Sequence, residues 1–206
     1  MNRPAFLPSL RLGSVILVLA AIVAQAVVLA EIGAFDPTRF FAFFTIQSNV
    51  VGVAAFLWLL VVGRRRRSRA LELLRGAAAV YLTVTFFVVI FLLSGVDVQL
   101  QLVWVDVALH KIFPVIVVLD WILDPPMHRL GARDLVTWLI YPLIWTVLTV
   151  IRGALDGWYP YPFLDPANGG YGQVAIVVVG VLVGFIGISA AILAIGGARS
   201  RGQTTG

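Results

Sequence analysis

Long apolar runs alternate with short polar segments along the whole chain, and this alternation is the strongest pattern in the sequence. Each run is close to the roughly 20 residues that a helix needs to cross a bilayer. The pattern predicts an all-α integral membrane protein, a six-transmembrane-helix bundle that forms a single domain over residues 1–206. The predicted helices cover about residues 10–30, 40–62, 71–93, 102–123, 135–151 and 173–195.

Composition excludes several classes of protein. The chain is 61% hydrophobic with a mean hydropathy of +1.00, which is more apolar surface than a soluble domain can bury. It has no cysteine, which excludes disulfides, thiol catalysis and cysteine-ligated metal sites. The pI of about 10.2 does not indicate a nucleic-acid partner, because the basic residues are nearly all arginines in short loops.

These arginines predict the orientation of the chain. Twelve of the fifteen Lys and Arg residues fall on one side of the bilayer if the six segments alternate. Short loops rich in Lys and Arg stay in the cytoplasm. We therefore expect a multi-pass protein with both termini in the cytoplasm.

The fourth predicted helix differs from the others because it carries Asp106, His110, Lys111 and Asp120. Ionisable side chains are costly in a bilayer, so they usually face the bundle interior and mark a functional site. His110 follows Asp106 by one helical turn, on the same face. Pro114 cannot donate a hydrogen bond to the carbonyl of His110, so the helix is predicted to kink there.

Polar and small residues form a stripe on the second predicted helix. Thr45, Ser48, Asn49 and Gly52 recur at i, i+3, i+4 and i+7. With a rise of ~1.5 Å per residue, Thr45 and His110 lie at similar depths in the outer half of the bilayer. Such residues often have structural roles alone, because Thr and Ser bond a carbonyl of their own helix and Asn joins helices. The stripe by itself leaves both interpretations open.

The chemistry that these groups support is nucleophilic. Neutral imidazole can take the proton of a neighbouring hydroxyl, which converts a weak nucleophile into an active one. The sequence thus predicts Thr45 as the nucleophile, His110 as the general base and Asp106 as the group that fixes the imidazole tautomer. Asn49 and Ser48 are candidates for holding an oxyanion or for positioning.

Several outer side chains are candidates for binding a substrate. Tyr141 and Trp145 belong to an aromatic face of the fifth predicted helix, which could line a slot for an acyl chain or serve packing alone. Arg152, at the outer end of that helix, could hold a carboxylate or extend to the interface. Gln47 and Lys111 complete this set, and Lys111 has the alternative of pairing with an outer acid.

Three short motifs are predicted to lie toward the outer side of the membrane: Phe-Phe-Thr45-Ile-Gln-Ser-Asn49, His110-Lys-Ile-Phe-Pro114 and Trp158-Tyr-Pro-Tyr-Pro-Phe163. Together they resemble the androgen-induced-protein family of multi-pass membrane proteins, in its bacterial form. Animal members of that family are threonine hydrolases of fatty acid esters of hydroxy fatty acids. The resemblance implies an intramembrane lipid esterase of a bacterial cell membrane, with Thr45 as nucleophile and His110 as base and with neither cofactor nor metal.

Other functions compete with this hypothesis. A proton-coupled or small-molecule transporter could use Asp106, His110 and Lys111, with Asp120, as a relay along one helix. Against it, residues 113–119 are all apolar. A metal or haem site has little support from a chain with two histidines. A structural scaffold is a further alternative, and the sequence determines neither the oligomeric state nor the natural substrate.

Overall fold

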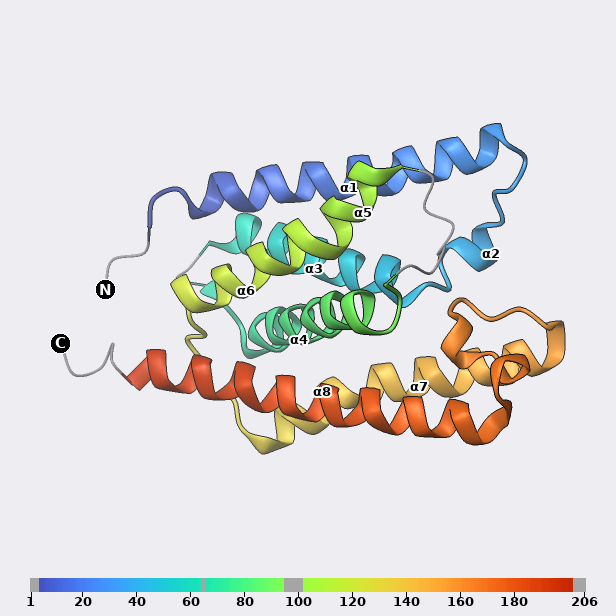
Figure 1. The fold of residues 1–206 in the computed structure, drawn as a ribbon. Coiled ribbons are helices and arrows are strands. Elements are labelled where there is room, and N and C mark those ends of the chain that lie inside the picture. Colours follow the sequence, from blue (N-terminus) through green and yellow to red (C-terminus); the bar gives the residue numbers. More distant parts are fainter. Residues whose placement is uncertain (1–3, 64–65, 95–101, 202–206) are drawn as a thin grey trace.

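The computed structural model describes residues 4–63, 66–94 and 102–201, and every regular element in these ranges is helical. Within them, five helices are long and apolar enough to cross a membrane (α1, α3, α4, α7 and α8), which confirms the prediction of an all-helical, membrane-type protein. The elements are α1 (Leu7–Glu31), α2 (Pro37–Phe40), α3 (Phe44–Val62), α4 (Arg69–Phe91), α5 (Val103–Val107), a π-helical turn (Ala108–Ile112), α6 (Phe113–Leu123), α7 (Ala132–Asp156), 3-10 turns at Pro162–Leu164 and Pro166–Asn168, and α8 (Gly170–Arg201) (Figure 1).

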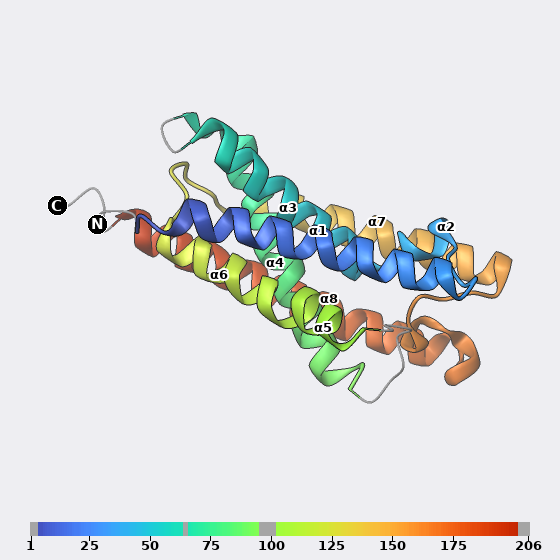
Figure 2. The same ribbon diagram turned by 90° about the horizontal axis from the view of Figure 1, so that it is seen from above.

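Helix α4 lies in the middle of the bundle. It packs against α3, α6, α7 and α8, and α1 packs against α3 and against the helical run from α5 to α6. The two views agree on this arrangement and show that α1 begins at the same end of the bundle at which α8 ends (Figures 1 and 2). Its central place explains why α4 is more buried than α7 or α8.

The fourth predicted helix is present as a composite of α5, the π-helical turn and α6, which follow one another without a break. In the π-helical turn the N–H of Phe113 bonds the carbonyl of Ala108, five residues back. This spacing moves the carbonyl that meets Pro114 from His110, as α-helical spacing predicts, to Leu109. The side-chain amide of Asn49 on α3 donates to the Leu109 carbonyl over 3.3 Å.

A second proline inside a helix is accommodated in the same way. Pro142 lies within α7 and has no N–H for the carbonyl of Trp138. The hydroxyl of Tyr81 on α4 donates to that carbonyl over 2.9 Å. Backbone groups that lose their partner in an apolar interior are costly, so neighbouring helices supply the replacement.

The second predicted helix begins later than its hydrophobic pattern indicates. Asp36 caps the short helix α2 by accepting hydrogen bonds from the N–H groups of Thr38 and Arg39. The chain then leaves helical geometry, and α3 starts at Phe44 after an extended Phe43. The prediction that this helix runs from residue 40 was therefore wrong, and Thr45 lies in the first turn of α3.

Six charged side chains form a buried ion cluster at the end of the bundle where α1 begins. Arg11 on α1 bonds Asp120 over 2.7 Å and Asp124 over 2.6 Å. Arg75 on α4 bonds Asp120 over 3.0 Å. These arginines were expected to be loop charges, but the structure buries them in a neutral cluster, while Arg3, Arg64 and Arg65 lie outside the described residues. The cluster comprises Arg11, Arg67, Glu72, Arg75, Asp120 and Asp124.

Candidate active site

Thr45, His110 and Asp106 form a continuous hydrogen-bonded row between α3 and the composite fourth helix. The Nε2 atom of His110 lies 3.2 Å from Oγ1 of Thr45, and its Nδ1 atom lies 2.8 Å from Oδ1 of Asp106. Thr45 and His110 are buried, whereas the carboxylate of Asp106 is partly exposed. Lys111 donates to the second oxygen of Asp106 over 3.2 Å. The structure thus brings together the predicted nucleophile, base and orienting acid.

The direction of each hydrogen bond in this row follows from the chemistry of the groups. The carboxylate of Asp106, which is paired with Lys111, can only accept, so Nδ1 of His110 carries the proton. Neutral His110 then presents a lone pair at Nε2, which accepts from the hydroxyl of Thr45. This is the arrangement in which an imidazole can take a proton from a hydroxyl that attacks.

Local structure fixes the side chains of Thr45 and His110. Thr45 is the second residue of α3, so its hydroxyl lies at the open end of the helix and its own N–H has no carbonyl one turn back. His110 lies in the π-helical turn, a rare element that often occurs at functional sites. Asn49 joins the two segments because its amide donates to the carbonyl of Thr45 over 2.8 Å as well as to Leu109.

The two candidates for the oxyanion site have other contacts. Both hydrogen bonds of the Asn49 amide go to backbone carbonyls, so this amide positions the site rather than facing it. The hydroxyl of Ser48 donates to the carbonyl of Thr45 over 3.0 Å and lies 3.4 Å from the hydroxyl of Thr85. Of the two roles that the sequence leaves open for Asn49 and Ser48, these contacts favour positioning over an oxyanion site.

Tyr161 contacts Thr45, although the sequence indicated only an aromatic residue of the membrane interface or of a rigid loop at this position and not a site residue. Its hydroxyl accepts the N–H of Thr45 over 3.2 Å and lies 3.3 Å from Oγ1 of Thr45. Burial raises the pKa of Tyr161, because the phenolate would lose its hydration, so the side chain stays protonated. The sequence feature that could have indicated such a contact is the position of Tyr161 between Pro160 and Pro162 in the aromatic motif.

Thr45 stands between two cavities, and together with Leu93 and Tyr161 it lines both of them. The polar cavity has a volume of about 200 Å³. Its wall contains His110 and, farther toward the loops, Asp36 and Arg39. It is the cavity that offers room for water and for polar groups of a ligand.

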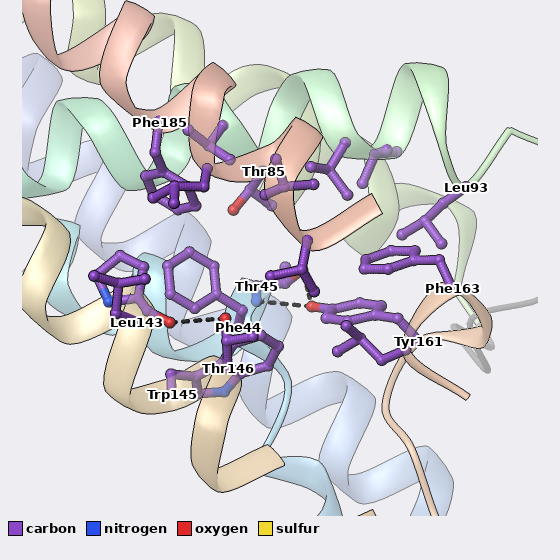
Figure 3. Close-up of a pocket in the computed structure, with 18 residues that line it drawn as sticks. Phe44, Thr45, Thr85, Leu93, Leu143, Trp145, Thr146, Tyr161, Phe163 and Phe185 are labelled. Atoms are coloured by element: carbon purple, nitrogen blue, oxygen red, sulfur yellow. Dashed lines mark hydrogen bonds between the residues drawn. The ribbon is translucent and has the colours of Figure 1, made fainter. Parts of the chain in front are cut away.

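The apolar cavity has a volume of about 70 Å³ and lies among α4, α7 and α8. Figure 3 shows Thr45 and Tyr161 at its side, with Phe185 and Leu143 lining it farther along. Its wall is almost entirely hydrocarbon, apart from the hydroxyls of a few Thr and Tyr residues. Such a wall suits an aliphatic chain.

The predicted substrate-binding residues fall in different places. Trp145 lines the apolar cavity. Gln47 and Tyr141 do not line either cavity and are joined to each other by a hydrogen bond of 2.5 Å. Lys111 pairs with Asp106 at the exposed rim. Arg152 is held by Asp156 and by Thr38 and stacks over Trp158, which lines the polar cavity, but Arg152 itself lines neither cavity.

The ionisable residues of the fourth predicted helix form two separate groups. Asp106, His110 and Lys111 share one site, whereas Asp120 belongs to the buried ion cluster, roughly 15 Å beyond His110 along the helix. The buried residues Phe113 and Val117 lie between them. No polar side chain on this helix connects the two groups within the part that the structure describes.

A comparison of the chain with protein-family models, with curated proteins and with solved structures finds no match.

Proposed function

We propose that the protein is an intramembrane lipid esterase that hydrolyses a fatty-acyl ester through an acyl-threonine intermediate. The observation that carries the proposal is the row Thr45–His110–Asp106, with a hydroxyl, an imidazole and a carboxylate at hydrogen-bond distances. The resemblance of the short motifs to the androgen-induced-protein family favours fatty acid esters of hydroxy fatty acids as substrates. Such a reaction needs no cofactor.

The reaction has two steps. His110 takes the proton of Thr45 as Oγ1 attacks the ester carbonyl, and it then gives this proton to the departing alcohol. The acyl group stays on Thr45. A water molecule from the polar cavity next loses its proton to His110 and attacks the acyl-threonine, which releases the fatty acid and restores the hydroxyl.

The two cavities suggest how the substrate is divided. The acyl chain occupies the apolar cavity among α4, α7 and α8, where it loses contact with water. The alcohol portion and the attacking water occupy the polar cavity beside His110. Thr45 borders both, so its hydroxyl faces the ester bond that joins the two portions of the lipid.

We further propose that the composite helix from α5 to α6 is a sixth membrane span. Six crossings bring both ends of the chain to one side of the membrane. This is consistent with Figure 1, in which α1 begins at the end of the bundle at which α8 ends. The arginine-rich loops favour the cytoplasm as that side, and the resemblance of the short motifs favours a bacterial cell. The row Thr45–His110–Asp106 then lies in the outer half of the membrane.

Hydrolysis of p-nitrophenyl acyl esters by the purified protein tests the function. Thr45→Ala and His110→Ala should each abolish turnover. Thr83→Ala is a matched control, because the Thr83 hydroxyl bonds only a carbonyl of its own helix among the described residues and should be dispensable. Full activity in Thr45→Ala, or no activity in the wild type on any acyl ester, would refute the proposal.

A further inference from the structure

The hydroxyl of Tyr161 is the last group in a hydrogen-bonded row that runs from Asp106 through His110 and Thr45. The chemistry of the other groups determines which atom donates in each hydrogen bond. Because the proton of Thr45 Oγ1 is directed to His110, a hydrogen bond across the 3.3 Å between Thr45 Oγ1 and the Tyr161 hydroxyl requires the phenol to be the donor. The phenol oxygen in turn accepts the N–H of Thr45. Hydrogen bonds in such a row polarise one another, so the N–H strengthens the phenol as a donor.

From this geometry we infer that Tyr161 is a further catalytic residue, which donates a hydrogen bond to the ester carbonyl oxygen as it becomes an oxyanion. The inference rests on the proposed esterase function and assigns the group that this mechanism still lacks. When Oγ1 of Thr45 bonds the carbonyl carbon, negative charge develops on the adjacent oxygen. The phenol O–H turns about its C–O bond from Oγ1 to that oxygen, and its proton stays on the phenol.

Other polar groups around Thr45 donate to atoms that do not change during the reaction. The amide of Asn49 and the hydroxyl of Ser48 both donate to the carbonyl of Thr45. The indole of Trp145 donates to the carbonyl of Ala42 over 2.9 Å. Among these neighbours in the described chain, Tyr161 is the one whose donor group contacts Oγ1 of Thr45, the atom proposed to attack the ester.

The surroundings of Tyr161 hold its ring in place before a substrate arrives. The ring stacks on Phe163 with a centroid separation of 5.2 Å and meets Phe43 edge to face at 5.7 Å. Pro160 and Pro162 restrict the backbone on both sides. A donor fixed in advance stabilises a transition state without reorganisation at the moment of reaction, which is the property that an oxyanion site requires.

The variant Tyr161→Phe tests the inference because it removes the hydroxyl and keeps the ring. We expect its kcat for p-nitrophenyl butanoate to fall by about 10²- to 10³-fold with little change in KM. The thiono analogue, in which sulfur replaces the carbonyl oxygen, accepts hydrogen bonds poorly. The wild type should therefore prefer the oxygen ester strongly, and Tyr161→Phe should lose most of that preference.

Tyr159→Phe is the matched control, because Tyr159 lies in the same motif but packs on Gly153 and lines neither cavity. It should keep wild-type kinetics and the wild-type preference. Wild-type kcat in Tyr161→Phe, or equal losses on the oxygen and thiono esters, would overturn the role of Tyr161 while Thr45→Ala still shows whether the esterase function holds. A wild-type protein without ester hydrolysis would overturn both.

Discussion

His110 and Thr45 lie 65 positions apart in the chain, yet Nε2 of His110 is 3.2 Å from Oγ1 of Thr45. Each comes from an irregular point of a helix: Thr45 from the first turn of α3, and His110 from the π-helical turn between α5 and α6. A regular helix buries its backbone donors and directs side chains evenly around its axis. These two irregularities place a hydroxyl and an imidazole opposite each other in an otherwise apolar interior.

Asp106 should determine the activity of His110. In Asp106→Asn the carboxylate that accepts from Nδ1 is lost, so the imidazole is no longer held in the tautomer that accepts from Thr45. We expect kcat for ester hydrolysis to fall roughly 10²- to 10⁴-fold. Lys111→Gln, at the exposed side of the same carboxylate, should have a much smaller effect. Equal losses in the two variants would contradict the orienting role of Asp106.

Asn49 should matter for geometry as well as for stability. Asn49→Ala leaves the carbonyl of Leu109 without its partner, and we expect a loss of about 1–3 kcal/mol in the free energy of unfolding. Because Asn49 also holds α3 against the π-helical turn, kcat should fall with it. Tyr81→Phe removes a comparable bond to the carbonyl of Trp138, and Tyr81 itself lines neither cavity. Thermal unfolding and kinetics of both variants in detergent should therefore show similar destabilisation but lost activity in Asn49→Ala alone.

The apolar cavity should set the preference for acyl-chain length. Val181 on α8 lines this cavity, and Val181→Phe reduces the space for a chain. We expect kcat/KM for a hexadecanoyl ester to fall by about 10- to 200-fold relative to a butanoyl ester. Val179→Phe changes a side chain that is 59% exposed on the same helix and should not alter the preference. An unchanged chain-length profile in Val181→Phe would place the acyl chain elsewhere.

The variant Asp120→Asn distinguishes the esterase hypothesis from the hypothesis of a transporter with a relay along the fourth predicted helix. Asp120→Asn leaves Arg11 and Arg75 short of a buried counter-charge, so we expect a loss of roughly 3–5 kcal/mol in the free energy of unfolding. The molecules that remain folded should hydrolyse esters at the wild-type rate, because the described side chains of the ion cluster do not contact Thr45, His110 or Asp106. A stable variant that has lost activity would instead indicate that Asp120 acts in function.

The sequence predicted the helical membrane architecture and drew attention to Thr45, His110 and Asp106, which the structure brings within hydrogen-bond distance. Apolar runs, and polar groups within them, are strong local signals. It did not predict that α3 starts at Phe44, because hydrophobicity does not show where a run leaves helical geometry. The π-helical turn was also missed, since Pro114 implies a freed carbonyl but not the helix spacing around it. Tyr161 reaches Thr45 from the loop after α7, a contact between distant segments that only the fold reveals.

The buried ion cluster illustrates the same limit. The arginines in the short loops of the sequence predicted an orientation, and their sequence positions gave no sign that Arg11, Arg67 and Arg75 would be buried. Glu72 on α4 is close to Arg67 and Arg75 in the chain, but Asp120 on α6 and Asp124 just after it lie at least 45 positions from these arginines. Pairing of this kind depends on how helices meet, which the hydrophobic pattern alone does not define.

The proposed function depends most on Thr45 being the nucleophile, and a covalent adduct tests this directly. The protein is treated with an alkyl fluorophosphonate, digested and analysed by mass spectrometry. The mechanism predicts one phosphonate on the peptide that contains Thr45, lost in Thr45→Ala and strongly reduced in His110→Ala. An adduct on Ser48, Thr85 or another residue, or undiminished labelling of Thr45→Ala, would contradict it.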